Sequence, residues 1–215
     1  MACGLTVNMI TNRIFDLALC ALIAPIAIPL MLAIYAFQRL SSEYPAFHYS
    51  VRAKQHCVPF KLIKFRTMKP INEGETASGG HQDDRISKSG RFLRKVRLDE
   101  LPQIWNILRG DMSFVGPRPP LLKYVNSFPE TYARVLQEKP GITGLATLKY
   151  HQREKVILSN ARTSAETEEI YRTICIPQKA RLDLLYCHHK SVCFDLQLIL
   201  KTIGTVILPK KTKDD

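Results

Sequence analysis

The stretch RFLRKVRLDELPQIWNILRGDMSFVGPRP, from Arg91 to Pro119, carries the features that decide how this chain folds. Apolar residues recur in it at the i, i+3, i+4, i+7 spacing of one helical face: Leu101, Ile104, Trp105 and Leu108. Gly110 stands where a glycine commonly ends a helix. Because proline is tolerated only in the first turn, Pro102 requires this helix to begin close to Asp99.

Two adjacent carboxylates, Asp99 and Glu100, therefore fall in the first turn of the predicted helix. The positive end of the helix dipole favours their ionised form, which a nucleophile or a metal ligand requires. The alternative is an acidic first turn that only caps the helix, beside a solvated basic face, because such turns are common. The carboxylates directly follow a dense basic run, which consists of Arg91, Arg94, Lys95 and Arg97.

The end of the stretch favours chemistry over simple capping. Gly116, Pro117 and Pro119 hold Arg118 in a stiff turn just beyond the carboxylate pair. A guanidinium held rigidly at that place suits a site that handles phosphate groups.

Composition narrows the function classes. The chain has 215 residues and a formal net charge of +12, of which residues 1–40 contribute only +1. A basic body of this kind seeks an anionic partner, and charge alone does not choose among nucleic acid, lipid head groups and phosphorylated substrates. The six cysteines form no CxxC pair and no zinc-site spacing with histidine, which favours a reducing, cytoplasmic environment.

The segment 14–37 is almost entirely apolar, with Asp16 as its one charged residue. As a helix it would be about 36 Å long, which is enough to cross a bilayer. Pro25 and Pro29 should bend it near its centre, so it could enter one leaflet and return to the same face, although a straight single span remains open. The basic residues after Arg39 place the body in the cytoplasm in either case.

The rest of the chain predicts a mixed fold with short elements. Residues 44–68 read as a β-hairpin that ends near Lys64, and 71–90 read as a loop. Residues 121–138 and 160–172 predict helices, and 139–146 predict a glycine-bearing turn whose amides could cradle an anion. A last helix is predicted to begin near Asp195, which would be its N-cap. This helix presents an apolar stripe, either to a membrane interface or to the soluble core: Leu196, Ile199, Leu200, Ile203 and Ile207.

Three of these motifs together resemble the bacterial sugar transferase family, the monotopic phosphoglycosyl transferases. The motifs are KFRTM at 64–68, LDELPQIWNILRGDMSFVGPRP at 98–119 and KPGITGLA at 139–146, in the family's order. The resemblance covers about 13–206. It departs from the family at Ala24-Pro25, where relatives carry Ser-Pro, and after Ala146, where the stretch that follows is unlike theirs.

The resemblance implies a membrane-associated α+β fold. A re-entrant, proline-broken membrane helix over 13–39 would precede a catalytic domain over 40–209, and 210–215 would be a disordered tail. That domain would be compact and mostly helical, with a small β-hairpin and interfacial amphipathic helices. The protein would lie on the cytoplasmic face of the bacterial inner membrane.

The resemblance also implies the chemistry. A sugar-1-phosphate would pass from a nucleoside diphosphate sugar, with a UDP-sugar as the expected donor, to a polyprenol phosphate such as undecaprenyl phosphate. This transfer initiates exopolysaccharide or glycoconjugate synthesis. Asp99 would form a covalent phosphosugar intermediate, and Glu100 would hold Mg²⁺ together with Asp99, assist the second attack, or both. Lys64, Arg94 and Arg118 would bind substrate phosphate.

The alternative function is a non-enzymatic, membrane-anchored basic domain that binds acidic partners or anionic lipid. It predicts strongly salt-dependent binding and no need for a carboxylate. The carboxylate pair next to the basic run speaks against it, because a pure anion binder would gain nothing from Asp99 and Glu100. Few aromatic residues lie near the run, so a platform that stacks nucleic-acid bases is not expected.

Overall fold

The computed structural model describes residues 2–70 and 85–207, with side chains over 10–70 and 85–205. Helix α1 (Ala2–Ser41) leads into a hairpin of β1 (Phe47–Ala53) and β2 (Pro59–Phe65), joined by the 3₁₀ turn η1 (Gln55–Cys57). The elements that follow are α2 (Lys88–Lys95), η3 (Leu98–Gln103), α3 (Ile104–Leu108), β3 (Ser113–Val115), α4 (Leu122–Ser127), α5 (Pro129–Val135), β4 (Gly141–Thr143), α6 (Leu145–Ser159), α7 (Ser164–Ile170), the π-helical turn η4 (Tyr171–Cys175), α8 (Ile176–His189) and α9 (Val192–Ile207). The fold is therefore α+β and mostly helical, as predicted, and the described residues form two small two-stranded sheets.

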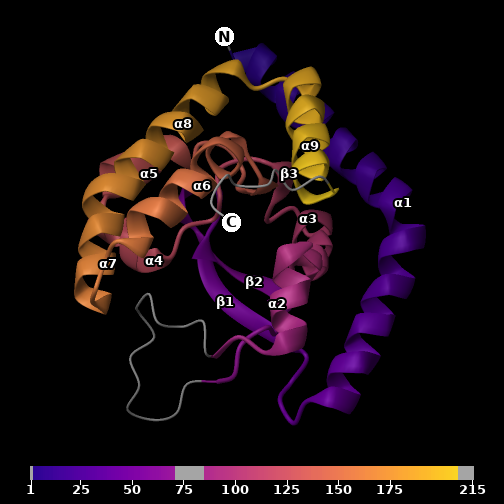
Figure 1. Cartoon of the computed structure of the whole chain (residues 1–215). Coiled ribbons are helices and arrows are strands. Elements are labelled where there is room, and N and C mark those ends of the chain that lie inside the picture. Colours follow the sequence, from indigo (N-terminus) through magenta and orange to yellow (C-terminus); the bar gives the residue numbers. More distant parts are fainter. Residues whose placement is uncertain (1, 71–84, 208–215) are drawn as a thin grey trace.

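Helix α1 lies along one side of the molecule and curves around it (Figure 1). One face packs on the body through residues at helical spacing, among them Asp16, Cys20, Ala27, Ile34 and Gln38. The outer face exposes large apolar side chains: Ile14, Leu22, Ile26, Leu32 and Phe37. The helix continues through Pro25 and Pro29, so the two prolines do not divide it into separate helices. Within Ile10–Ser41 it contains an 18-residue stretch with a mean hydropathy of 2.6, which is long and apolar enough for a helix that can enter a membrane.

The predicted hairpin is present, and its two faces serve different purposes. Side chains alternate along β-strands, so each strand contributes to both faces. On one face Phe47, Tyr49 and Ile63 line an apolar groove against α1 and Trp105 of α3. On the other face Arg52 and Lys64 line a polar pocket.

The central stretch forms a helix in two pieces. The first turns are the 3₁₀ segment η3, with Asp99 and Glu100 in its first turn and Pro102 inside it, and α3 follows without a break. The helix ends at Leu108, and Gly110 follows two residues later with a left-handed φ of 82°, close to the helix end that the sequence predicted. The predicted apolar face is only partly covered, because Trp105 remains 56% exposed and faces the groove beside α1.

The segment 139–146, predicted as a turn, contains a short strand. Strand β4 pairs in parallel with β3, with Ser113 opposite Gly141 and Val115 opposite Thr143. The amide of Gly141 donates to the Pro117 carbonyl oxygen at 2.9 Å, so this amide does not cradle an anion as the sequence suggested. The pairing clamps the turn that carries Arg118.

Gly141→Ala should lower the free energy of unfolding by about 3 kcal/mol, because overpacking a rigid backbone contact cannot be relieved by a side-chain rotation. A Cβ atom there would lie 2.1 Å from the Gly116 nitrogen. Thermal melting in detergent micelles measures the effect. The matched control is Gly204→Ala in α9, where a Cβ meets nothing within 4 Å and helix propensity should raise stability by up to about 1 kcal/mol. Equal melting temperatures for the two variants would contradict the clamp.

The C-terminal half corrects two further predictions. The helix predicted over 121–138 is two short helices, α4 and α5, because Phe128 leaves the helical conformation before Pro129 starts the next helix. Asp195 does not cap α9. It is 3% exposed and accepts a hydrogen bond from the Tyr186 hydroxyl at 2.7 Å, while the Ser191 hydroxyl accepts from the Phe194 amide.

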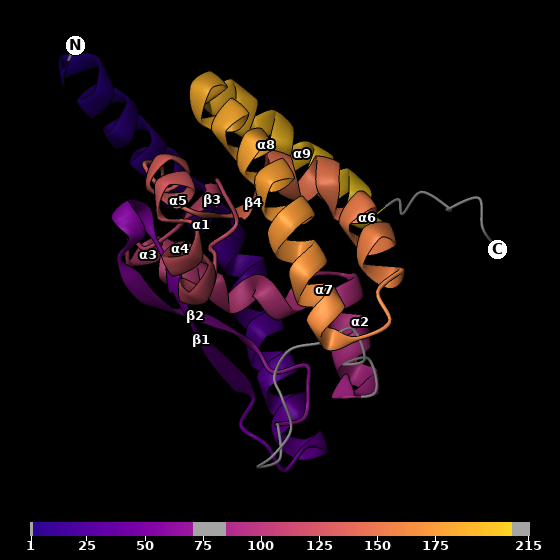
Figure 2. The same ribbon diagram turned by 90° about the vertical axis from the view of Figure 1, so that its left-hand side faces the viewer.

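Helices α8 and α9 meet at one end and spread apart over the body (Figures 1 and 2). Leu198 of α9 is buried against the core, whereas Leu196, Leu200 and Ile203 are 46–59% exposed. Helix α9 thus packs on the core with one face and exposes an apolar stripe on another. Both alternatives that the sequence left open, packing on the core and contact with a membrane interface, are therefore compatible with this helix. The disordered tail predicted at 210–215 and most of the loop predicted at 71–90 lie outside the described residues.

Candidate active site

A small pocket of about 40 Å³ lies between the hairpin, η3 and the turn after β3. Its walls combine charged side chains from segments far apart in the sequence. They are Arg52, Lys64, Asp99, Glu100 and Arg118, with Leu62, Gln103, Pro119 and Gly141 completing the lining. The structure therefore brings together four of the five predicted site residues.

Two local arrangements place the carboxylate pair, Asp99 and Glu100, opposite the hairpin. Asn106 of α3 completes the edge of β2: its Nδ2 donates to the Lys61 carbonyl oxygen at 2.8 Å, and its Oδ1 accepts from the Ile63 amide at 3.1 Å. These bonds fix the helix that carries Asp99 against the strand that carries Lys64. The β3–β4 clamp then brings Arg118 to the same pocket.

Asp99 is almost completely buried, with 8% of its surface exposed. Burial raises the pKa of its carboxyl group and the neighbouring Glu100 raises it further, whereas Lys64 and Arg94 lower it. This corrects the expectation from the helix dipole, because loss of water opposes ionisation more strongly than one short 3₁₀ turn favours it. Within the described residues no other side chain forms a hydrogen bond or ion pair with Asp99, so its carboxylate is available to an incoming group.

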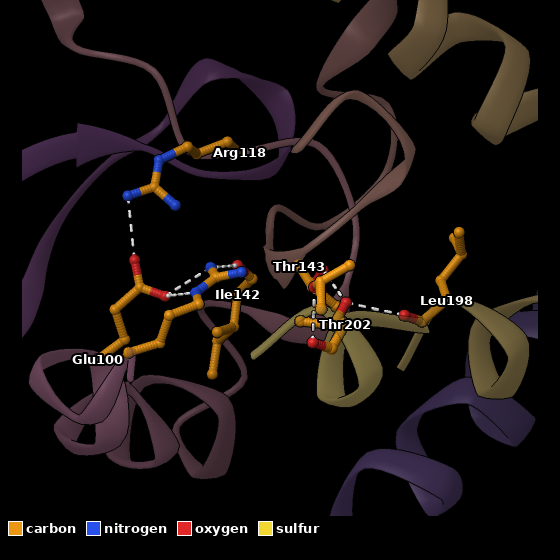
Figure 3. Close-up of polar contacts among 8 residues, drawn as sticks. Glu100, Arg118, Ile142, Thr143, Leu198 and Thr202 are labelled. Atoms are coloured by element: carbon orange, nitrogen blue, oxygen red, sulfur yellow. Dashed lines mark hydrogen bonds and ion pairs between the residues drawn. The ribbon is translucent and has the colours of Figure 1, made fainter. Parts of the chain in front are cut away.

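Glu100 is equally buried, but both of its oxygens are occupied. Oε1 accepts from Arg118 Nη2 at 3.0 Å, and Oε2 accepts from Arg97 Nη2 at 2.6 Å and from Arg97 Nε at 3.1 Å. Burial alone would raise the pKa of Glu100, but the charges of Arg118 and Arg97 outweigh it and lower the pKa below its ordinary value. Figure 3 shows Glu100 between Arg118 and the segment that contains Ile142. The two adjacent carboxylates are thus in opposite states, one free and one held.

The cations outnumber the carboxylates around the pocket. Burial lowers the pKa of the Lys64 amine, and the nearby charges of Arg94 and Arg52 lower it further. Arg94 does not line the pocket. It donates to the Thr67 hydroxyl at 2.8 Å, and its charge acts on Lys64 and Asp99 from outside the pocket. A buried cation without a counterion is costly, so this pocket favours entry of an anion.

Arg52 is the site residue that the sequence interpretation missed. Its guanidinium donates to the Ser50 hydroxyl and to the Pro119 carbonyl oxygen, and no carboxylate pairs with it among the described residues. Burial and the charge of Arg118 lower its pKa. Strand alternation held the signal, because Arg52 lies opposite Phe60 in the register and so shares a face with Lys64.

Few of the described side chains around the pocket could serve as ligands to a divalent ion. No group of three or more His, Cys, Asp or Glu side chains is arranged to hold a metal within the described ranges 10–70 and 85–205. Asp99 offers one unpaired carboxylate, and Glu100 can join it only if an arginine gives up its bond. This set suits Mg²⁺, which keeps several waters and commonly binds through one or two carboxylates and the phosphates of a substrate.

A comparison with known protein families decides the classification. The family model described as "Bacterial sugar transferase" matches residues 7–209, nearly the whole chain. The chain belongs to the bacterial sugar transferase family. The family resemblance inferred from the three motifs is thereby confirmed.

Several named relatives are similar to this family member over most of its chain. The UDP-glucose:undecaprenyl-phosphate glucose-1-phosphate transferase of Caulobacter vibrioides is 34% identical over 91% of this chain and 69% of its own length. The uncharacterized sugar transferase EpsL of Bacillus subtilis is 35% identical over 93% of this chain and 89% of its own. The UDP-N-acetylgalactosamine-undecaprenyl-phosphate N-acetylgalactosaminephosphotransferase of Aeromonas hydrophila is 30% identical over 91% of this chain and 43% of its own. The first and third of these relatives share a lipid acceptor in their names but differ in the sugar.

Proposed function

We propose that this sugar transferase moves a sugar-1-phosphate from a UDP-sugar to undecaprenyl phosphate and thereby initiates synthesis of an exopolysaccharide or related glycoconjugate. The observation that carries the proposal is the unpaired, buried Asp99 carboxylate in a pocket lined by Lys64, Arg52 and Arg118. A pocket that only bound anions would be weakened by such a carboxylate. The names of the relatives supply the substrate classes.

In the first step a carboxylate oxygen of Asp99 attacks the phosphorus that bears the sugar. The bond from this phosphorus to the bridging oxygen breaks, and uridine monophosphate leaves with the electron pair. In the second step an oxygen of undecaprenyl phosphate attacks the same phosphorus, and Asp99 departs as a carboxylate. Both nucleophiles are already anions, so neither step requires a base to remove a proton.

The cations of the pocket stabilise the charge that gathers on the phosphoryl oxygens. Lys64 and Arg52 reach the pocket from the hairpin, and Arg118 reaches it from the opposite wall. Fixed donors in a site with little water are worth far more than the same donors in water. The predicted phosphate-binding roles of Lys64 and Arg118 are therefore proposed as direct, and that of Arg94 as acting through its charge.

A bound Mg²⁺ would neutralise part of the diphosphate charge and polarise its oxygens. Asp99 is the residue that would hold it, together with oxygens of the donor. Glu100, the second predicted ligand, would join only by exchanging Arg97 or Arg118 for the ion. The main role of Glu100 in this pocket is therefore to hold Arg97 and Arg118.

We also propose that α1 stays in one leaflet, with both ends at the cytoplasmic face. The supporting observation is that both halves of the helix contact the same body. In the first half, Asp16 Oδ1 accepts from the Ser113 hydroxyl at 2.9 Å and from the Phe114 amide at 3.1 Å. Near the end, Gln38 Nε2 donates to the Arg66 carbonyl oxygen at 2.9 Å. A straight span would draw this basic body into the bilayer, where exposed charges are costly. The apolar outer face of α1 and the curve seen in Figure 1 fit a re-entrant path.

Thiol labelling tests this topology. Cysteine placed at Asn12 or at Ser42 should react with an impermeant maleimide only after cells are opened, because both positions face the cytoplasm. The parent protein, without the added thiol, provides the background. Labelling of Asn12→Cys in intact cells, with Ser42→Cys protected, would show a single span instead.

An assay against a panel of donors tests the function. Membranes that contain the protein are incubated with undecaprenyl phosphate, Mg²⁺ and a set of nucleoside diphosphate sugars, and the release of nucleoside monophosphate is measured. We expect release from one or a few UDP-sugars, and none without the lipid acceptor beyond a single turnover. The panel must be broad because the named relatives use different sugars. Release from no donor, together with strongly salt-dependent binding of anions, would favour the non-enzymatic alternative.

A further inference from the structure

Arg97, which stands two residues before Asp99, holds an unusual backbone conformation. Its φ of 57° and ψ of 21° are left-handed, and it is one of three non-glycine residues with positive φ among those described. Residues other than glycine adopt this conformation at a cost in free energy, and such residues gather at functional sites. The left-handed conformation at Arg97 ends the segment that follows α2 and turns the chain so that Asp99 and Glu100 enter the pocket.

The side chain of Arg97 is as constrained as its backbone. Both Nε and Nη2 donate to Glu100 Oε2, at 3.1 and 2.6 Å, and Nη2 also donates to the Ile142 carbonyl oxygen at 2.9 Å. The side chain is only 25% exposed. Arg97 therefore connects one catalytic-site carboxylate to strand β4 through a single rigid guanidinium.

The anchor on β4 is itself held in place. Thr143, next to Ile142, shares a hydrogen bond of 2.7 Å between its hydroxyl and that of Thr202 in α9, and the Thr202 hydroxyl donates to the Leu198 carbonyl oxygen at 2.8 Å (Figure 3). Leu198 is buried in the core. The chain of contacts from Glu100 thus ends on a fixed part of the body.

Glu100 is consequently an anion between two guanidinium groups. Arg118 holds Oε1 through Nη2 alone, which leaves its remaining N–H groups available to a ligand in the pocket. Both oxygens of Glu100 already accept N–H groups from the two arginines, so this carboxylate is poorly placed to accept a proton.

We propose that Arg97 is a positioning residue: it fixes the Glu100 carboxylate, and Glu100 in turn aims Arg118 at the diphosphate of the donor. This inference rests on the proposed function, and it assigns Glu100 to orienting an arginine instead of transferring a proton. Loss of Arg97 would leave Glu100 held from one side, free to rotate and to take Arg118 with it. The reaction would then proceed with a misplaced cation, at a cost of about 10²-fold in rate.

Replacement by glycine separates the side chain from the backbone. Glycine adopts the left-handed conformation freely, so Arg97→Gly removes the ion pair without straining the fold. We expect kcat with the donor identified in the panel assay to fall about 10²-fold, with KM changed less and with the melting temperature retained. Arg97→Lys keeps the charge but not the two-pronged contact, and should recover only part of the rate. Millimolar methylguanidinium should partly rescue Arg97→Gly.

The control is Arg109→Ala, because Arg109 is 65% exposed and lies outside the pocket. It should not change the rate. An Arg97→Gly protein with wild-type kcat would overturn the inference while leaving the proposed function intact. A wild-type protein that releases no nucleoside monophosphate would overturn both.

Discussion

Asp99→Asn should abolish turnover, with a loss of about 10⁴-fold or more in kcat, because the amide has no anionic oxygen to attack phosphorus. The substitution is nearly isosteric, and no described side chain depends on Asp99 for a hydrogen bond. The variant should therefore fold, remain in the membrane fraction and retain binding of the donor. Release of uridine monophosphate is the measurement.

Asp111→Asn is a suitable control for this experiment. Asp111 is also a partly buried carboxylate, but it pairs with Lys54 at 2.6 Å and lies outside the pocket. Its loss should cost stability and leave the chemistry largely intact. If Asp99→Asn kept more than a few per cent of wild-type turnover, the assigned nucleophile would be wrong.

Arg118→Met should lower kcat/KM by about 10²- to 10³-fold, as does removal of one fixed donor from other sites that stabilise a developing anion. Arg118 is the one pocket cation presented by a stiff turn, and half of its side chain is exposed toward the incoming donor. Arg118→Lys keeps the positive charge but lacks the planar guanidinium. Its kcat/KM should therefore lie between those of the wild type and Arg118→Met. Initial rates over a range of donor concentration give the comparison.

Arg109→Met is the matched control for the arginine. Both side chains are long, charged and at least half exposed, but only Arg118 lines the pocket. We expect Arg109→Met to retain wild-type kcat/KM. Equal losses in the two variants would mean that general positive charge, and not a placed guanidinium, drives the reaction.

The features predicted best were those written into local sequence. The hairpin, the left-handed Gly110 and the acidic first turn of the central helix follow from short-range rules on glycine, proline and alternation. The structure brings Asp99 and Glu100 into one pocket with Lys64 and Arg118, and the functional roles of these residues stay predictions. The α+β class and the family followed from the same residues.

The features that were missed depend on contacts between distant segments. Strand β4 exists because β3, which lies well before it in the chain, offers it a partner, and no local pattern predicts such a pairing. Asp195 looked like a helix cap, but its carboxylate is buried against Tyr186 from α8. The direction of the pKa shift of Asp99 was misjudged for a similar reason, because burial by the assembled pocket raises this pKa, whereas the local helix dipole was expected to lower it.

Arg52 and Arg97 show the same limit within the site. Both lie in basic segments where a solvated side chain is the ordinary expectation. Only the folded chain shows that Arg52 enters the pocket from β1 and that Arg97 turns back to hold Glu100. The net positive charge of the chain predicted a site for anions. The different contacts of the individual cations could be recognised only from the three-dimensional arrangement.

The proposed covalent intermediate can be detected by measuring the mass of the protein after incubation with its donor and Mg²⁺ in the absence of undecaprenyl phosphate. The acid-quenched protein should gain the mass of one sugar phosphate, the added mass should map to the peptide that contains Asp99, and added undecaprenyl phosphate should remove it. An active protein that gains no mass, or that carries the sugar phosphate on another residue, would contradict the proposal that Asp99 takes phosphorus from the donor.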